Sequence, residues 1–122
     1  MTDVNEDAPD EVDAVMATLR AEYAERLPEL VTELRVALEA LRNGDITEQA
    51  VRTPRVLAHR LYGTAGSYEF DRISEAASAI ETQLLSCENA GKLPDDAAWQ
   101  EIARALHVIE AEVAAAMETK RS

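Results

Sequence analysis

The sequence has few of the residues that build disulfide-linked or turn-rich folds. Among 122 residues there are one cysteine, Cys87, four glycines and four prolines. A single cysteine excludes an internal disulfide bond and is typical of a reducing compartment, so we expect a cytoplasmic protein. So few glycines and prolines argue against an all-β fold, which needs many tight turns.

Aromatic residues and long apolar runs are scarce as well. Aromatic residues make up 4% of the chain, although hydrophobic residues reach 47%. Alanine and leucine supply much of this hydrophobic content, which favours helices over sheets. No apolar run approaches the roughly 18 residues that a membrane span needs. The first ten residues, MTDVNEDAPD, are acidic and contain no apolar core, so we expect neither a membrane partner nor a signal peptide.

Positive charge is in short supply. Lysine and arginine number 12 against 24 aspartates and glutamates, which gives a formal net charge of −12. This charge argues against binding to nucleic acid or to an anionic membrane. Residues 51–62 are an exception, because they hold three arginines and no acid. Two interpretations stay open here: a local fluctuation of composition, or a cationic collar around an anionic group.

Motifs for nucleotide or metal binding are missing too. The sequence contains no GxGxxG, P-loop, HExxH or CxxC motif. His59, His107 and Cys87 do not have the spacing of a metal-binding set. We therefore expect no cofactor, no metal site and no ATP site on this chain.

Apolar residues recur at intervals of three and four along most of the chain, which predicts four amphipathic helices. Residues 1–9 are polar and are predicted to form a disordered acidic tail. The first helix is predicted to follow Asp10, to pass through Pro28 with a kink, and to end at the Asn-Gly-Asp of residues 43–45. Residues 46–52 are predicted to be a connector, and a turn of helix within it stays open.

The other three helices have recognisable ends. Thr53 is a good N-cap, and Pro54 suits the first position of the second helix. Aspartates are predicted to cap the third helix (Asp71) and the fourth (Asp95 or Asp96). Four helices with mostly short connections predict an all-α fold: an antiparallel four-helix bundle with a long kinked N-terminal helix.

This bundle is predicted to form one domain over residues 10–118, followed by a frayed C-terminus at residues 119–122. The length suits one domain, and we see no repeat and no second domain.

The second helix has an unusual outer face. At about 100° per residue its apolar residues share one side, and His59 falls almost diametrically opposite. Gly63 and Gly66 are placed on the same outer face, with Arg55 and Tyr62 beside it. Two glycines inside a helix cost roughly 1 kcal/mol each relative to alanine. Bare backbone beside an exposed imidazole would let another macromolecule approach the ring, which is nucleophilic near neutral pH.

Residues 58–67, AHRLYGTAGS, resemble the signature of histidine phosphotransfer (HPt) domains. Those domains are helical bundles that carry a phosphoryl group on one histidine between receiver-domain aspartates. The residues that match the family pattern are His59, Leu61, Gly63, Thr64 and Ala65.

Two positions depart from the family pattern. The usual lysine three residues after the histidine is Tyr62, which weakens the expected phosphate binding, although its hydroxyl could still donate a hydrogen bond. The usual glycine ten residues after the histidine is Glu69. This places a β-carbon at a helix end, where glycine often adopts a left-handed conformation.

The resemblance implies a phosphorelay carrier. His59 would accept a phosphoryl group from a receiver aspartate and pass it to a second receiver, and the receiver would supply the Mg²⁺. The implied partners are receiver domains of response regulators or of hybrid histidine kinases, which we expect to bind a monomer of this chain. The residues expected to contact the partner or the phosphate are Arg55, Arg60, Tyr62, Gly63 and Gly66.

Two alternatives stay open. A non-phosphorylated HPt-like docking module would sequester a receiver or a histidine kinase, and Tyr62 and Glu69 favour this interpretation. An unrelated helical enzyme or scaffold would need a polar cluster inside the bundle, where the pattern places apolar residues almost throughout. His107 lies in the stretch ALHVIE, which holds no glycine and no basic residue, so we assign it to the bundle surface.

Overall fold

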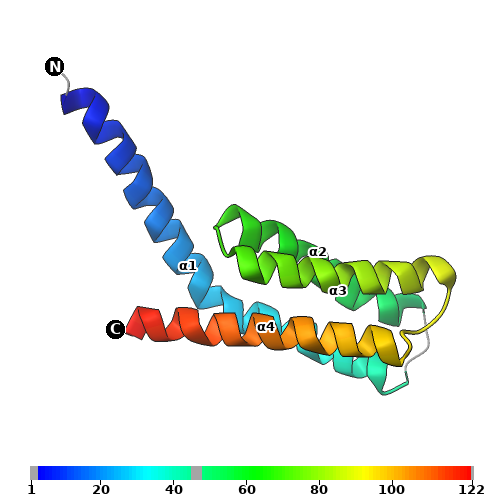
Figure 1. The fold of residues 1–122 in the computed structure, drawn as a ribbon. Coiled ribbons are helices and arrows are strands. Elements are labelled where there is room, and N and C mark those ends of the chain that lie inside the picture. The colour runs from blue at the N-terminus through cyan, green and yellow to red at the C-terminus, as the bar shows by residue number, and fades with distance from the viewer. Residues whose placement is uncertain (1–2, 45–47, 122) are drawn as a thin grey trace.

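The structure, a computed structural model, describes residues 3–44 and 48–121, and the side chains of residues 11–44 and 50–119. Within these ranges it consists of four helices and contains no strand. The helices are α1 (Asp3–Arg42), α2 (Glu48–Ser67), α3 (Asp71–Ala90) and α4 (Asp96–Arg121). Successive helices run in opposite directions (Figure 1), which confirms the predicted all-α four-helix bundle.

The helices pack in sequence order around one core. Each helix contacts the next one along the chain, and α4 closes the bundle against α1. Within the described residues no Cα atoms of the diagonal pairs α1–α3 and α2–α4 come within 8 Å of each other. The largest side chains with almost no exposed surface are Leu27, Leu34, Leu41, Pro54, Ile73, Ile80, Leu84 and Ile109. The apolar stripes read from the sequence therefore meet in the middle of the bundle.

α1 is one continuous helix that bends. Figure 1 shows its first part leaving the bundle and its direction changing in the light-blue region. Pro28 lies inside α1 and has no N–H to donate, and Thr32 Oγ1 donates to the Pro28 carbonyl at 2.8 Å. α1 already begins at Asp3, so its helical backbone includes residues 3–9, which composition had predicted to be a disordered tail. Met1 and Thr2 lie outside the described residues.

α1 ends close to the predicted place. The Gly44 N–H donates to the Leu41 carbonyl at 3.3 Å, and Gly44 has a φ of 102°, a left-handed conformation that glycine adopts without strain. Asp45 and the first part of the predicted connector, residues 46 and 47, lie outside the described residues.

The predicted start of α2 is wrong. α2 begins at Glu48, so Thr53 and Pro54 lie inside the helix and cap nothing at its start. Pro54 removes one backbone donor from the helix, and the burial of its ring in the core offsets that loss. Cap-like residues also occur inside helices when tertiary packing favours them, and this misled the sequence prediction.

The caps of α3 and α4 differ from each other. The N-cap of α3 is Phe70, which makes no side-chain capping bond, and Asp71 is the first helical residue rather than the cap. There its charge still favours the positive end of the helix dipole. For α4 the prediction is confirmed, because the Ala98 N–H donates to Asp95 Oδ1 at 2.8 Å.

The turn between α2 and α3 contains a strained residue. The Phe70 N–H donates to the Ala65 carbonyl (2.8 Å) and the Glu69 N–H donates to the Gly66 carbonyl (3.1 Å), which is the Schellman arrangement. Glu69 has a φ of 65° and is the one non-glycine residue with positive φ in the described chain. A β-carbon in this conformation costs roughly 1–2 kcal/mol. The strain expected from replacing glycine at this position is therefore present.

Aromatic contacts fix this turn against α1. The Tyr23 ring stacks on Tyr68 with 4.8 Å between ring centres and lies 5.9 Å from Phe70. The Tyr23 hydroxyl is 2.6 Å from Thr64 Oγ1, and burial raises the pKa of Tyr23. Arg20 Nε donates to the Tyr68 carbonyl at 2.9 Å, and its guanidinium lies 4.2 Å from the centre of the Phe70 ring. These contacts hold the C-terminal end of α2 in place relative to the bundle.

Candidate functional site

His59 lies on the outer face of α2. The opposite face is held in the core by Ala58, Leu61 and Ala65, each exposed to 4% or less. The side chain of His59 is 63% exposed, as its position on the helix predicts. The imidazole is therefore accessible to another macromolecule.

Glu81 on α3 orients the imidazole. Its Oε2 lies 2.7 Å from His59 Nδ1, and its side chain is only 19% exposed. Because a carboxylate accepts hydrogen bonds and does not donate them, Nδ1 carries the proton in this contact. Nε2 of the neutral ring then keeps its lone pair. The contact selects the tautomer in which Nε2 is the nucleophile.

Sequence reasoning missed Glu81 as a site residue. The helical pattern of α3 places it off the apolar stripe, which indicated only a surface position. Its role depends on how α2 and α3 align, with residue 59 level with residue 81. A single sequence gives no signal for the alignment of two helices, so the pairing could not be found from it.

The cationic collar, formed by Arg52, Arg55 and Arg60, is partly neutralised by ion pairs within the chain. Glu88 lies two helical turns after Glu81 on α3, and its Oε1 is 2.5 Å from Arg55 Nε. Its Oε2 is 3.5 Å from Arg52 Nε. One partly buried carboxylate, 14% exposed, therefore holds two arginines. Arg60 is exposed and has no ion pair within the part of the chain that the structure describes.

The two glycines have different surroundings. A β-carbon on Gly63 would meet nothing within 4 Å, so Gly63 leaves open space one turn after His59. A β-carbon on Gly66 would lie 3.1 Å from Ser74 Oγ on α3, and Ser74 Oγ donates to the Tyr62 carbonyl at 2.8 Å. Gly66 therefore faces α3 and permits close packing of the two helices. Gly66 is nevertheless exposed, as the helical pattern predicts, so both glycines lie on the outer side of α2, and Gly63 is the one whose surroundings are open.

Tyr62 lies beside the histidine. Its side chain is 44% exposed, and its ring centre is 6.4 Å from that of His59. The tyrosine thus lies next to the imidazole, at the position where the HPt pattern usually has a lysine. His107 is exposed on α4, as predicted.

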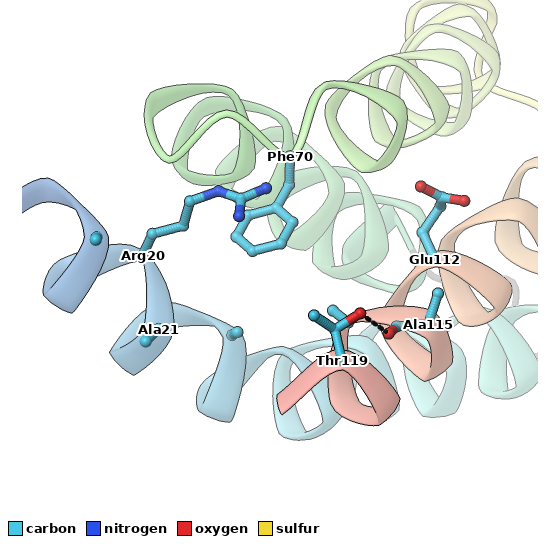
Figure 2. A pocket seen from close by; sticks show the side chains of 9 residues that line it. Arg20, Ala21, Phe70, Glu112, Ala115 and Thr119 are labelled. Carbon is cyan, nitrogen blue, oxygen red and sulfur yellow. Dashed lines mark hydrogen bonds between the residues drawn. The ribbon is translucent and has the colours of Figure 1, made fainter. Parts of the chain in front are cut away.

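A groove of about 450 Å³ lies elsewhere, between α1, α4 and the α2–α3 turn (Figure 2). Its walls are mostly alanine, together with Phe70 and Thr119. Its two charged side chains are engaged within the chain: Arg20 with the Tyr68 carbonyl and the Phe70 ring, and Glu112 with Arg72 at 3.4 Å. The groove therefore offers no unpaired charge to a ligand.

Metal ligands do not gather within the described ranges. There, no group of three or more histidine, cysteine, aspartate or glutamate side chains could hold a metal ion. A search of the same residues found no helix long and apolar enough to cross a membrane.

A family model described as "Hpt domain" matches residues 15–119. The chain belongs to the Hpt domain family. Hpt domains act in phosphorelay signalling, where they interact with receiver domains. A comparison with curated proteins gave no match, and a comparison with solved structures gave none either. The family match covers α2 and α3 completely, and with them His59 and Glu81.

Proposed function

We propose that this Hpt domain carries a phosphoryl group on His59 Nε2, taken from the aspartyl phosphate of one receiver domain and passed to the aspartate of another. The observation that carries the proposal is the contact between Nδ1 of the exposed His59 ring and Glu81 Oε2. It leaves the lone pair of Nε2 free to attack phosphorus.

The transfer of the phosphoryl group needs no further reactant beyond the two proteins. Nε2 forms a bond to phosphorus while the bond between phosphorus and the aspartate oxygen breaks, and the aspartate leaves as a carboxylate. The proton on Nδ1 stays in place, so the phosphorylated ring gains positive charge. The Glu81 carboxylate stabilises that charge, as a carboxylate does for a catalytic imidazolium. Return of the phosphoryl group to a second aspartate reverses the same steps.

In this proposal the metal belongs to the receiver. Phosphoryl transfer needs in-line geometry and positive charge around the equatorial oxygens. The carboxylates of the receiver hold Mg²⁺, and this chain contributes the nucleophile and its arginines. No cofactor is bound to the Hpt domain itself.

The ion pairs of Glu88 allow an exchange of partners, in which Arg55 leaves Glu88 for a phosphoryl group on His59. Arg55 precedes His59 by one helical turn, so its side chain lies within reach of a phosphoryl group on the ring. Phosphate carries more negative charge than the Glu88 carboxylate and draws Arg55 toward Nε2. Arg52, already 3.5 Å from the other oxygen of Glu88, keeps that carboxylate paired after Arg55 leaves.

Three further residues have roles at the same face. Arg60, exposed and without an ion pair in the described structure, attracts the acidic pocket of a receiver. Gly63 lets the partner backbone approach the ring. Tyr62 donates its hydroxyl to a phosphoryl oxygen in place of a lysine ammonium. Gly66 supports the site indirectly, through the packing of α2 on α3.

The proposal places a monomeric carrier in the cytoplasm, in the same compartment as its receivers. Cys87 supports a reducing environment, because it is buried as a free thiol in the core.

A second candidate is a docking module that binds a receiver or a histidine kinase without being phosphorylated. Tyr62 favours it, since the place of the usual cation beside His59 holds a neutral side chain. The intact Glu81 contact favours the carrier, because docking alone requires no particular tautomer.

Incubation with a receiver that carries ³²P on its aspartate tests the proposal. We expect an acid-labile, base-stable label on the wild type and on His107→Gln, and none on His59→Gln. Circular dichroism should show equal helicity for all three proteins. Receiver binding without label on the wild type would favour the docking module instead.

A further inference from the structure

The first part of α1 carries a cluster of exposed apolar side chains. Val12, Val15, Met16 and Leu19 are exposed to 60%, 58%, 40% and 38%. The other large hydrophobic residues that are similarly exposed lie far apart in the sequence: Val36, Tyr62, Leu85 and Leu93. Single exposed apolar residues are normal on a protein surface, whereas a cluster rimmed by polar groups marks an interaction site. We call Val12, Val15, Met16 and Leu19 the α1 stripe.

The α1 stripe has the pattern of a helix-packing face. Its members recur at intervals of three and four residues, in line with Tyr23, whose buried ring begins the core. Figure 1 shows the first part of α1 leaving the bundle, and within the span of the α1 stripe only Ala17 lines the groove that α1 forms with α4. The α1 stripe therefore extends the inner face of the bundle beyond the point where the chain covers it.

Acidic side chains predominate along the two edges of the α1 stripe. At 100° per residue, Glu11 and Glu22 lie along one edge and Asp13 along the other, and all three are exposed. Arg20 is the one basic residue between positions 11 and 22. It shares the edge of Asp13, but its side chain donates to the Tyr68 carbonyl and its guanidinium is turned toward the Phe70 ring. Four more acids precede the α1 stripe in the sequence: Asp3, Glu6, Asp7 and Asp10.

These charges decide between possible occupants. Two copies of this chain paired through their α1 stripes would bring acidic edges together, and like charges at such edges oppose pairing. An anionic membrane is disfavoured for the same reason. A helix with an apolar face bordered by lysine and arginine would match both the stripe and its edges.

We propose that the α1 stripe is a docking surface for a basic amphipathic helix of another protein. The helix packs its apolar side chains against Val12, Val15, Met16 and Leu19, and its cations pair with Glu11, Asp13 and Glu22. This surface is separate from His59 and does not depend on the transfer of a phosphoryl group.

Two designed peptides test the proposal on the full chain. Both are three-heptad helices with leucine at the apolar positions, and they differ only in the bordering residues, which are lysine and arginine in one peptide and glutamate in the other. We expect the basic peptide to bind ¹⁵N-labelled protein with NMR shift changes confined to residues 11–23. We expect the acidic peptide not to bind. Affinity for the basic peptide should fall as salt is raised, because exposed charges are screened.

Two variants locate the binding. Val12→Ser with Val15→Ser should weaken binding of the basic peptide by at least about tenfold, since a few apolar anchors carry most of an interface's binding energy. Val36→Ser is the matched control: Val36 is also on α1 and is 56% exposed, but it lies outside the stripe, so binding should not change. Circular dichroism should show unchanged helicity in both variants.

Several outcomes would overturn the proposal. Equal binding of the two peptides would remove the role of charge, and shift changes centred on His59 would place the site elsewhere. Concentration-dependent association of the wild type in sedimentation velocity, lost in Val12→Ser with Val15→Ser, would assign the α1 stripe to a second copy. Binding of the wild type to phosphatidylcholine vesicles through the same valines would assign it to a lipid surface.

Discussion

His59 Nδ1 lies 2.7 Å from Glu81 Oε2, across the interface between α2 and α3. The two side chains come from helices that pack along their lengths, so the ring orientation is set by the bundle rather than by a loop. With the proton on Nδ1, Nε2 is the nitrogen left for reaction. The bundle thus makes an exposed histidine into an oriented nucleophile.

Glu81 gives the first prediction. Glu81→Ala should slow phosphorylation of His59 by about tenfold, because loss of a charge-assisted hydrogen bond of about 1.4 kcal/mol corresponds to that factor. Glu81→Gln should lose less, since its amide oxygen still accepts from Nδ1–H. Rates of transfer from a phosphorylated receiver measure both effects, and ¹H–¹⁵N NMR of the ring reports the tautomer. Wild-type rates and an unchanged tautomer in Glu81→Ala would show that this contact is incidental.

The arginines around Glu88 give the second prediction. Arg55→Gln should lower the equilibrium constant for forming phospho-His59 by about two- to fivefold, the range for an exposed ion pair of about 0.5–1 kcal/mol. Arg52→Gln should have a smaller effect, because Arg52 only takes over the pairing with Glu88. Arg72→Gln is the control, since Arg72 pairs with Glu112 on α4. The fraction phosphorylated at equilibrium with one receiver is the measurement. Equal values for Arg55→Gln and Arg72→Gln would contradict the exchange.

The strained turn gives the third prediction. Glu69→Gly should raise the free energy of unfolding by about 1 kcal/mol, because glycine adopts positive φ without the β-carbon clash. Glu75→Gly, at an exposed position inside α3, should lower the free energy by a similar amount, since glycine is a poor helix former. Urea denaturation of the two variants compares the signs directly. Destabilisation by both would mean that Glu69 makes compensating contacts.

Tyr23 gives the fourth prediction, which concerns pH. Burial raises the pKa of Tyr23 above its ordinary value of 10.0, so the folded protein keeps this proton to higher pH than the unfolded chain does. The stability linked to this proton is fully present below about pH 10 and is lost as pH rises through the raised pKa. Tyr23→Phe should make the decline of stability above pH 10 shallower.

The same variant has a second effect at neutral pH. Tyr23→Phe should lower the free energy of unfolding by about 1 kcal/mol at pH 7, because the hydrogen bond to Thr64 is lost. Urea denaturation at several pH values from 7 to 11 measures both effects. Parallel pH profiles for wild type and variant would show that another group controls the alkaline loss of stability.

Much of the fold could be predicted from the sequence because helical periodicity is a local signal. The four helices, the Asp95 cap and the outward position of His59 all follow from spacing or from one residue's chemistry. The left-handed conformation at residue 69 is instead implied by the resemblance to HPt domains, which usually have glycine there. Thr53 and Pro54 misled the start of α2, because the same residue types serve as caps at helix ends and as packed residues inside helices.

The rest of the site depends on how α2 and α3 align. The partner of His59 is 22 residues away in sequence, Glu88 collects two arginines from α2, and Gly66 meets Ser74. Each of these contacts follows from the relative register of two helices, which core packing sets over their whole length. A helical wheel treats each helix alone, so it gave the exposure of Gly66 correctly but could not show how closely Gly66 approaches α3.

The central claim is that Nε2 of His59 carries the phosphoryl group, and NMR of the phosphorylated protein tests it most directly. The protein, labelled with ¹⁵N in its histidine rings, is phosphorylated by a receiver and held at alkaline pH, where phosphohistidine persists. We predict a ³¹P signal coupled to Nε2 of His59, with the proton remaining on Nδ1, and no phosphorylation of His107. A phosphoryl group on Nδ1 of His59, on another residue, or on no residue of the chain would contradict the account.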